Sequence, residues 1–213
     1  MSFRRNVVPV ILAGIIPAAA LAVLVYLLLL RPGPPPPVDA TRAPLRIKEI
    51  CLSGNIPWRA WSEIVIHHSA GENGDLDLVD RVHRKEKDWQ QAGYHFVIGN
   101  GTLSGDGEIE VGPRWPAQQD GAHCWGRNTT AIGVCLIGNF DIKNNAPSEA
   151  QMKSLLELTA YLAARYDIPM ERIGFHNDLA DAKKPTRCPG KNFPKEAFRR
   201  RLAPLIETYR PAQ

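Results

Sequence analysis

The sequence carries almost no excess charge once its first 31 residues are set aside. Those residues hold three arginines and no acidic residue, whereas the rest of the chain has 23 basic and 22 acidic residues. The sequence pI of about 8.9 therefore comes largely from the first residues. Because nucleic-acid-binding domains carry clustered basic surfaces, the composition argues against a nucleic-acid partner.

Other features are also missing or rare. The sequence shows no internal repeat, and it has no HExxH motif, so the glutamate that serves as general base in many zinc peptidases is absent. Only four cysteines are present. An exported domain could pair some of them, and a bridge between Cys51 and Cys124 stays open. Cys135 lies in the apolar run AIGVCLIG, which predicts a buried apolar residue.

The N-terminal segment lacks charge over a long stretch. Residues 7–30 contain no charged side chain. With a rise of about 1.5 Å per residue, a helix of this length crosses a hydrocarbon core of roughly 30 Å. Arg4 and Arg5 precede it, which favours a cytoplasmic N-terminus. We therefore expect residues 1–31 to form a transmembrane helix that anchors the chain in a lipid bilayer.

A cleaved signal peptide is the alternative for this segment, with the alanines at 18–20 as its cleavage site. The apolar run continues for ten residues past Ala20, whereas the apolar region of a signal peptide is about 7–15 residues long and ends near the cleavage site. This favours the anchor, and cleavage would instead give a secreted protein. Both interpretations place the rest of the chain outside the cytoplasm, on the periplasmic or cell-wall side.

The exported part begins with a spacer. The stretch RPGPPPPVDA contains four successive prolines, so residues 32–41 are predicted to form an extended linker. Residues 42–213 are predicted to form one domain. The sequence sets no oligomeric state for it.

Short apolar runs in this domain predict an α/β architecture. Five runs of branched and aromatic residues, bounded by Gly, Asn, Ser or Asp, are typical of strands. They cover residues 64–68, 94–98, 109–111, 132–137 and 172–176. Helical spacing of apolar residues predicts helices over residues 76–89 and 148–166, the second with a capping box of Ser148 and Gln151. Strands alternating with helices indicate a sandwich around one central sheet.

A last helix is predicted to begin near Pro194, since proline is favoured in a first turn. Pro204 follows ten residues later. Proline removes a helix hydrogen bond and clashes with the preceding turn, so we expect Pro204 to kink or break this helix.

Two of the predicted strands end on histidine. The first ends on His67 and His68, the last ends on His176, and Cys188 follows twelve residues after His176. Neighbouring side chains of a strand point to opposite faces, so only one of the paired histidines is expected to face a given site. Two imidazole nitrogens and a thiolate suit zinc. Three protein ligands leave a fourth tetrahedral position open, as in catalytic zinc sites.

The order of motifs over residues 63–190 resembles a known enzyme family. IVIHHSA, GYHFVIGNG, GAHCWGRNTTAIGVCLIGNF and FHNDLADAKKPTRCPG are similar, in this order, to motifs of the zinc-dependent type 2 N-acetylmuramoyl-L-alanine amidases, which include phage-lysozyme-like amidases and peptidoglycan recognition proteins. The resemblance implies a central mixed sheet flanked by helices, Zn²⁺ as cofactor and peptidoglycan as substrate. It implies hydrolysis of the amide between the lactyl group of N-acetylmuramic acid and L-alanine of the stem peptide.

The resemblance also implies roles for individual residues. It implies that His67, the first of the paired histidines, binds zinc together with His176 and Cys188. It implies catalytic roles for Tyr94, in GYHF, and for Thr186, two residues before the cysteine. Phage members have lysine at the Thr186 position, so this residue resembles the recognition-protein branch. The loop between His176 and Cys188 is longer than is usual in the family, which bears mainly on the geometry of Thr186.

The chemistry of these residues agrees with amide hydrolysis, which needs a nucleophile, a stabilised oxyanion and a proton for the leaving nitrogen. Zinc can acidify a water molecule and polarise the carbonyl. A hydroxyl of Tyr94 or Thr186 could face the oxyanion, and one well-placed donor contributes about 2.7–4 kcal/mol. The general base is not identified; Tyr94 and the zinc-activated water itself are the candidates.

Four more residues are expected to line a substrate groove. These are His123, Trp125, Asn128 and Trp115. His123 resembles a histidine near the family's groove, and loop aromatics often contact ligands, although they also pack in cores. His83 and His95 are interpreted as structural. A peptidoglycan receptor without catalysis and a zinc amidase for another amide remain alternatives. Cys188 argues against the receptor, because some family members have lost this cysteine and only bind.

Overall fold

The computed structural model describes residues 44–210 except residues 53 and 55. Its elements in chain order are α2 (Leu45–Leu52), β1 (Glu63–His68), α3 (Leu76–Lys87), β2 (Phe96–Ile98), β3 (Ile109–Val111), β4 (Ala131–Leu136), α4 (Glu149–Arg165), the 3₁₀ helix η1 (Met170–Arg172), β5 (Ile173–Phe175), α5 (His176–Leu179) and α6 (Lys195–Tyr209). The expected anchor over residues 1–31 and the linker over residues 32–41 lie outside the described residues. None of the described helices combines the length and the hydropathy needed to cross a bilayer.

The five strands form one mixed sheet in the order β3-β2-β4-β1-β5. Strand β1 pairs in parallel with β4 and β5, and β2 is parallel to β4 but antiparallel to β3. Every residue of β1 and β4 is buried, as expected for central strands of a sheet covered on both faces. The prediction of a mixed central sheet flanked by helices is therefore confirmed.

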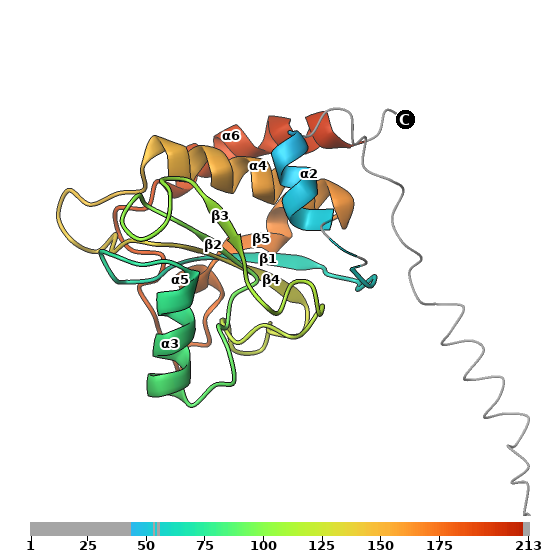
Figure 1. Cartoon of the computed structure of the whole chain (residues 1–213). Coiled ribbons are helices and arrows are strands. Elements are labelled where there is room, and N and C mark those ends of the chain that lie inside the picture. The colour runs from blue at the N-terminus through green and yellow to red at the C-terminus, as the bar shows by residue number, and fades with distance from the viewer. Residues whose placement is uncertain (1–43, 53, 55, 211–213) are drawn as a thin grey trace, which may run out of the picture. The chain divides into compact units, whose positions relative to one another are not determined.

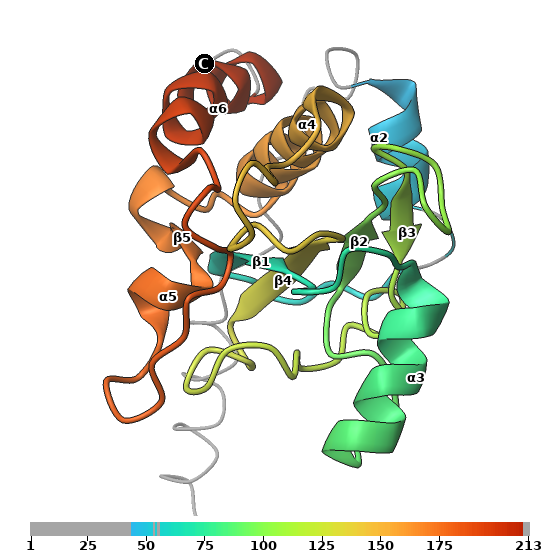
Figure 2. The same cartoon turned by 90° about the vertical axis from the view of Figure 1, so that its left-hand side faces the viewer.

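The two faces of the sheet have different covers. Helices α4, α6 and α2 lie on one face and α3 lies on the other, as Figures 1 and 2 show. Residues of β1 alternate between them: Ile64 and Ile66 join the large core under α4 and α6, whereas Val65 packs in a separate small cluster. His67 follows Val65 by two positions, so it faces the same side as Val65. The side chain of this histidine is thereby directed away from the main core.

The ends of the elements differ from the predictions in informative ways. Strand β2 begins at Phe96 rather than Tyr94. His95 N still donates to Gly133 O of β4 (2.9 Å), whereas Gly93 O accepts a hydrogen bond from the loop residue Ala122 (2.9 Å). Strand β5 ends at Phe175, and His176 is the first residue of α5 rather than the last of the strand. Tyr94 and His176 thus lie just outside regular strands.

The helix predictions are confirmed for α3, α4 and the start of α6, and the capping box at Ser148 is present. The expected break at Pro204 is wrong, because α6 continues through it to Tyr209. A proline inside a helix costs roughly 3 kcal/mol. Leu202, Ile206 and Tyr209 are buried on the same helix, and burial of one such side chain contributes about 1.5–3 kcal/mol. Packing against the core therefore outweighs the proline.

All four cysteines are unpaired. Cys51 lies in the main core, whereas Cys124 packs with Val65 in the small cluster on the other side of the sheet. The bridge that the sequence left open is therefore not formed. Cys135 is fully buried in β4, as predicted.

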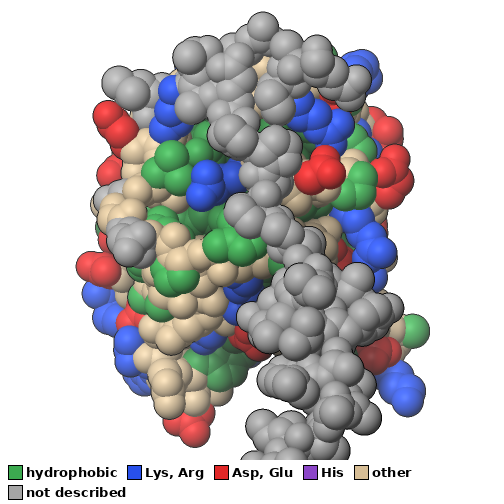
Figure 3. All heavy atoms as spheres, turned by 90° about the vertical axis from the view of Figure 1, so that its right-hand side faces the viewer, with side chains coloured by type: hydrophobic (Ala, Val, Ile, Leu, Met, Phe, Trp, Pro, Cys, Tyr) green, Lys and Arg blue, Asp and Glu red, His purple; other side chains and the backbone are tan. Residues whose placement is uncertain are grey.

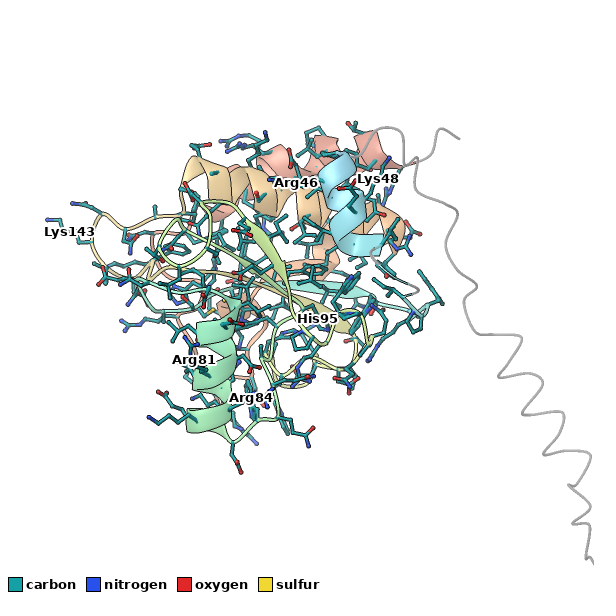
Figure 4. The ribbon with its side chains drawn as sticks, in the orientation of Figure 1. Arg46, Lys48, Arg81, Arg84, His95 and Lys143 are labelled. Carbon is teal, nitrogen blue, oxygen red and sulfur yellow. The ribbon has the colours of Figure 1, made fainter. Side chains whose placement is uncertain are left out.

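Charged side chains are distributed over several elements. Figure 4 shows that Arg46 lies on α2, Arg81 and Arg84 on α3, and Lys143 on the loop between β4 and α4. Some of them are paired, since Arg46 contacts Glu157 at 3.3 Å. On the face seen in Figure 3, basic and acidic side chains are interspersed among apolar ones.

Candidate metal centre and active site

Three potential metal donors meet at one edge of the sheet. His67 lies on β1, His176 begins α5 directly after β5, and Cys188 lies on the loop before α6. Because β1 and β5 are parallel, their carboxyl ends lie at the same edge, which brings the two histidines together. Donor atoms of the three residues lie within 4.8 Å of one another, and the two rings have centroids 4.6 Å apart.

The spacing of one donor pair matches that of two ligands on a tetrahedral ion. The distance from Cys188 Sγ to His67 Nδ1 is 3.6 Å. A zinc ion with Zn–N of about 2.1 Å and Zn–S of about 2.3 Å holds two tetrahedral donors about 3.6 Å apart. The pair of Cys188 and His67 has this spacing, and His176 offers a third donor atom within 4.8 Å of both.

His67 and His68 face opposite sides of the sheet, as strand alternation predicts. His68 Nδ1 accepts a hydrogen bond from Phe140 N (3.2 Å), and its ring lies beside Phe140. The backbone of His68 still supports the site, because His68 N donates to Cys188 Sγ (3.3 Å). A donor to sulfur favours the thiolate that a metal ion requires.

Burial sets the protonation of the three donors. It lowers the pKa of His67 well below 6.5 and also lowers the pKa of His176, so both rings are neutral at pH 7. Burial raises the pKa of the Cys188 thiol to about 12. A metal ion bound here must therefore displace a proton from Cys188, since a coordinating thiol is deprotonated.

Tyr94 lies beside the donors. Its ring centroid is 5.1 Å from that of His67. It also lines a cavity of about 110 Å³ together with Ser69, Leu78 and His83. Burial raises the pKa of the Tyr94 hydroxyl well above 10, so the phenol is protonated at neutral pH. The hydroxyl is suited to donate a hydrogen bond rather than to act as a base.

Thr186 supports the loop that carries the cysteine. Thr186 Oγ1 accepts a hydrogen bond from Cys188 N (3.2 Å), and Asn177 N donates to Cys188 O (2.7 Å). A hydroxyl that accepts one hydrogen bond can also donate one, so Thr186 could donate to another group. Figure 2 shows the long segment between α5 and α6 as an outward loop, so its extra length is accommodated away from the sheet.

Two of the four expected groove residues make hydrogen bonds that stabilise the fold. Trp115 is fully buried, and its Nε1 donates to Cys51 O (3.2 Å). It is therefore not available to line a groove, and that prediction is wrong. Asn128 Oδ1 accepts hydrogen bonds from the backbone N–H groups of His123 and Cys124, both at 2.9 Å, so this side chain shapes its own loop.

The other two groove candidates differ in exposure. Trp125 is 68% exposed, with Lys184 Nζ 4.9 Å above its ring, so it can contact a ligand. His123 is buried, and its Nδ1 lies 3.2 Å from Nε2 of His67. It therefore lies behind the metal donor rather than on the surface of a groove.

Two further histidines flank the site. His95, labelled in Figure 4, accepts at Nδ1 from Gly133 N (2.9 Å) and donates from Nε2 to Gln119 O (3.0 Å), which is the structural role that we predicted. His83 is more than a helix residue, because its ring lies 5.4 Å from Tyr94 and lines the same cavity. Its position on the apolar stripe of α3 is the signal that the sequence offers.

We expect the metal-free protein to lose stability between pH 7 and pH 5. Burial lowers the pKa of His95 to about 4 and that of His123 to about 3. In the unfolded chain each takes up a proton near pH 6.5, whereas in the folded chain it does not. The contribution of each histidine to the free energy of unfolding is therefore fully present above pH 6.5. It decreases as the pH falls toward the pKa of that histidine in the folded chain. Each histidine should remove about 2 kcal/mol by pH 5.

Urea unfolding in the presence of a chelator measures this loss. The control is His95→Gln, which should lose about 2 kcal/mol less than the parent chain over the same pH interval. A free energy of unfolding that is unchanged between pH 7 and pH 5 would show that these rings are not held neutral by burial.

A mixed sheet that gathers two histidines, a cysteine and a tyrosine at one edge has the arrangement of a metal-dependent hydrolase. Residues 57–191 match the family described as N-acetylmuramoyl-L-alanine amidase (Amidase_2). The chain belongs to this family of peptidoglycan amidases, and N-acetylmuramoyl-L-alanine amidase is its enzyme class.

Relatives and solved structures agree with this assignment. The endolysin of Klebsiella phage KP32 is 35% identical over 134 residues, which cover 60% of this chain and 80% of the endolysin. Peptidoglycan-recognition protein SC2 of Drosophila melanogaster is 29% identical over 141 residues, covering 62% and 70%. The structure of the amidase LysC from Clostridium intestinale URNW is similar with a TM-score of 0.57 and 32% identity, covering 70% of this chain and 93% of LysC.

These relatives come from both branches of the family. The phage endolysin shares more identical residues with this chain than the recognition protein does. The resemblance to the recognition-protein branch therefore rests on Thr186 rather than on overall identity.

Proposed function

We propose that this chain is a zinc enzyme that hydrolyses the amide between the lactyl group of N-acetylmuramic acid and L-alanine of the peptidoglycan stem peptide. The observation that carries the zinc requirement is the convergence of His67, His176 and Cys188 within 4.8 Å of one another. Family membership supports the bond that is cut.

The residues of the site would have different roles in hydrolysis. When bound, zinc would supply Lewis acidity, which polarises the scissile carbonyl and acidifies an attacking water. Two neutral imidazoles and one thiolate would hold it with a net charge of +1, which preserves that acidity. The protonated hydroxyl of Tyr94, whose ring lies 5.1 Å from that of His67, would donate a hydrogen bond to the oxyanion. The Thr186 hydroxyl is the second candidate donor.

Two adjoining cavities, the first of them lined by Tyr94, offer room for the peptide part of the substrate. The cavity of about 110 Å³ beside Tyr94 runs along α3. A second cavity of about 440 Å³ shares Asn73 and Ile137 with the first and is lined by Asn100 and Asn144. Amide side chains can pair with peptide groups and carboxylates, so we propose that the stem peptide extends from Tyr94 along both cavities.

Digestion of defined muropeptides tests the proposal. The full chain with zinc should release free stem peptide that begins with L-alanine, detected by mass spectrometry. A chelator should stop the reaction and added zinc should restore it. Release of the peptide in a zinc-depleted, chelated sample would contradict the zinc requirement, and a product cut at another bond would contradict the specificity.

We also propose that residues 1–31 anchor the enzyme in the bilayer with the amidase domain outside the cytoplasm. The uncharged run over residues 7–30 supports this, and so does the extracytoplasmic position of peptidoglycan. Intact mass and alkaline extraction of membranes test it. A full-length protein that resists extraction is expected, whereas a soluble protein that begins near residue 21 would indicate cleavage.

A further inference from the structure

A chain of hydrogen bonds links a backbone carbonyl of β4, the ring of His123 and the ring of His67. His123 Nε2 lies 3.2 Å from Ala131 O, a carbonyl of β4, and His123 Nδ1 lies 3.2 Å from His67 Nε2. His123 is buried and takes part in no ion pair among the described residues. An unpaired charge is costly in such a place, so the ring is neutral.

The direction of this chain follows from the chemistry of its ends. A carbonyl oxygen only accepts, so His123 Nε2 carries the hydrogen and its Nδ1 is the acceptor. His67 must then donate from Nε2, which leaves the lone pair of the His67 ring on Nδ1. That nitrogen is the atom 3.6 Å from Cys188 Sγ. The chain therefore selects the tautomer in which His67 can bind a metal ion on the side of the other donors.

The His123 ring lies close to two glycines, Gly121 and Gly133. A Cβ atom on Gly121 would lie 2.2 Å from His123 Cδ2, and one on Gly133 would lie 2.5 Å from the same atom. Gly133 lies inside β4, where glycine weakens a strand and often marks the close approach of another group. The backbone N–H of His123 is held by Asn128 Oδ1 at 2.9 Å. Glycine at these two positions therefore leaves the space that the His123 ring occupies.

We propose that His123 is a positioning residue that fixes the tautomer and orientation of His67 and thereby raises zinc affinity. The proposal rests on the zinc requirement proposed above. Metal-binding histidines usually donate their second N–H to a carboxylate, a carbonyl or a water, and loss of such a partner typically lowers metal affinity about 10–100-fold. Here His123 accepts the second N–H of His67, and the N–H of His123 donates to Ala131 O.

A matched pair of variants separates the hydrogen bond from packing. His123→Leu and His123→Asn introduce side chains of similar size, both smaller than imidazole, so they leave similar cavities. Asparagine carries an oxygen on Cγ where histidine carries Nδ1, so it can still accept from His67 Nε2, whereas leucine cannot. Zinc affinity is measured by competition with a chelating dye. His123→Leu should bind zinc about 10–100-fold more weakly, and His123→Asn should lose less than about tenfold.

Equal losses in the two variants would overturn the proposal, since they would indicate a packing role, and so would unchanged affinity in His123→Leu. Circular dichroism establishes that both variants fold. Long-range ¹H–¹⁵N NMR of the zinc-free parent chain provides a second test that needs no variant. His67 should carry its hydrogen on Nε2, and hydrogen on Nδ1 would overturn the proposal. If the parent chain binds no zinc, the proposed function fails instead, and the NMR result still decides the direction of the hydrogen-bonded chain.

Discussion

Replacing Cys188 by serine should remove zinc from the protein and lower kcat/KM by about a thousandfold or more, because a metal-activated water contributes several kcal/mol to such a reaction. A serine hydroxyl does not ionise near neutral pH, so the variant lacks the anionic donor that completes the site. Two neutral imidazoles from His67 and His176 would remain. Zinc content by elemental analysis and muropeptide turnover measure the two losses.

A second buried cysteine provides the control for this variant. Cys51 lies in the main core on the other face of the sheet, so Cys51→Ala should keep both zinc and turnover. Binding of muropeptide by Cys188→Ser should persist, because Cys188 lines neither of the two cavities proposed to hold the stem peptide. Undiminished turnover in Cys188→Ser would contradict the role of the thiolate. A parent chain that binds muropeptide but never cuts it would instead indicate a receptor.

Replacing Tyr94 by phenylalanine should lower kcat by about 10²–10³-fold, the effect of removing one oxyanion donor. The substitution keeps the ring that packs beside His67 and removes only the hydroxyl. Since that hydroxyl is proposed to bind the oxyanion rather than the ground state, KM should change little. Steady-state kinetics on a defined muropeptide separate the two constants.

The control for the tyrosine variant is a buried tyrosine far from the site. Tyr209 lies on α6, so Tyr209→Phe should leave kcat unchanged. Zinc content should also be unchanged in Tyr94→Phe. An unaltered kcat would assign Tyr94 to packing alone, and a loss of zinc would show that it acts through the metal site rather than on the oxyanion.

Local patterns were sufficient to predict much of the sheet and its helices. The run EIVIHH is buried throughout as β1 because it is a central strand paired on both sides with parallel strands. Ser148 and Gln151 satisfy each other's backbone groups at the start of α4 as their spacing indicates. The alternation of side chains along β1 also predicts that only one of two adjacent histidines can face the metal donors.

Tertiary packing determines the features that local sequence patterns do not predict. Trp115 and Trp125 both lie outside regular elements, yet one is fully buried and the other is 68% exposed. Pro204 is accommodated because its helix packs on the core, and α2 has no clear signal in the sequence. The same limit applies to the site. The sequence predicts His123 at the groove, but its ring occupies the space left by Gly121 and Gly133 and lies 3.2 Å from Nε2 of His67.

X-ray absorption at the zinc K-edge of the zinc-loaded full chain tests the central claim most directly, because it counts and identifies the atoms around the metal. We predict one sulfur at about 2.3 Å and three lighter atoms at about 2.0–2.1 Å, from His67, His176 and a water. The sulfur should be absent from any zinc that Cys188→Ser retains. A first shell without sulfur in the parent chain, or with two or more sulfurs, would contradict the site described here.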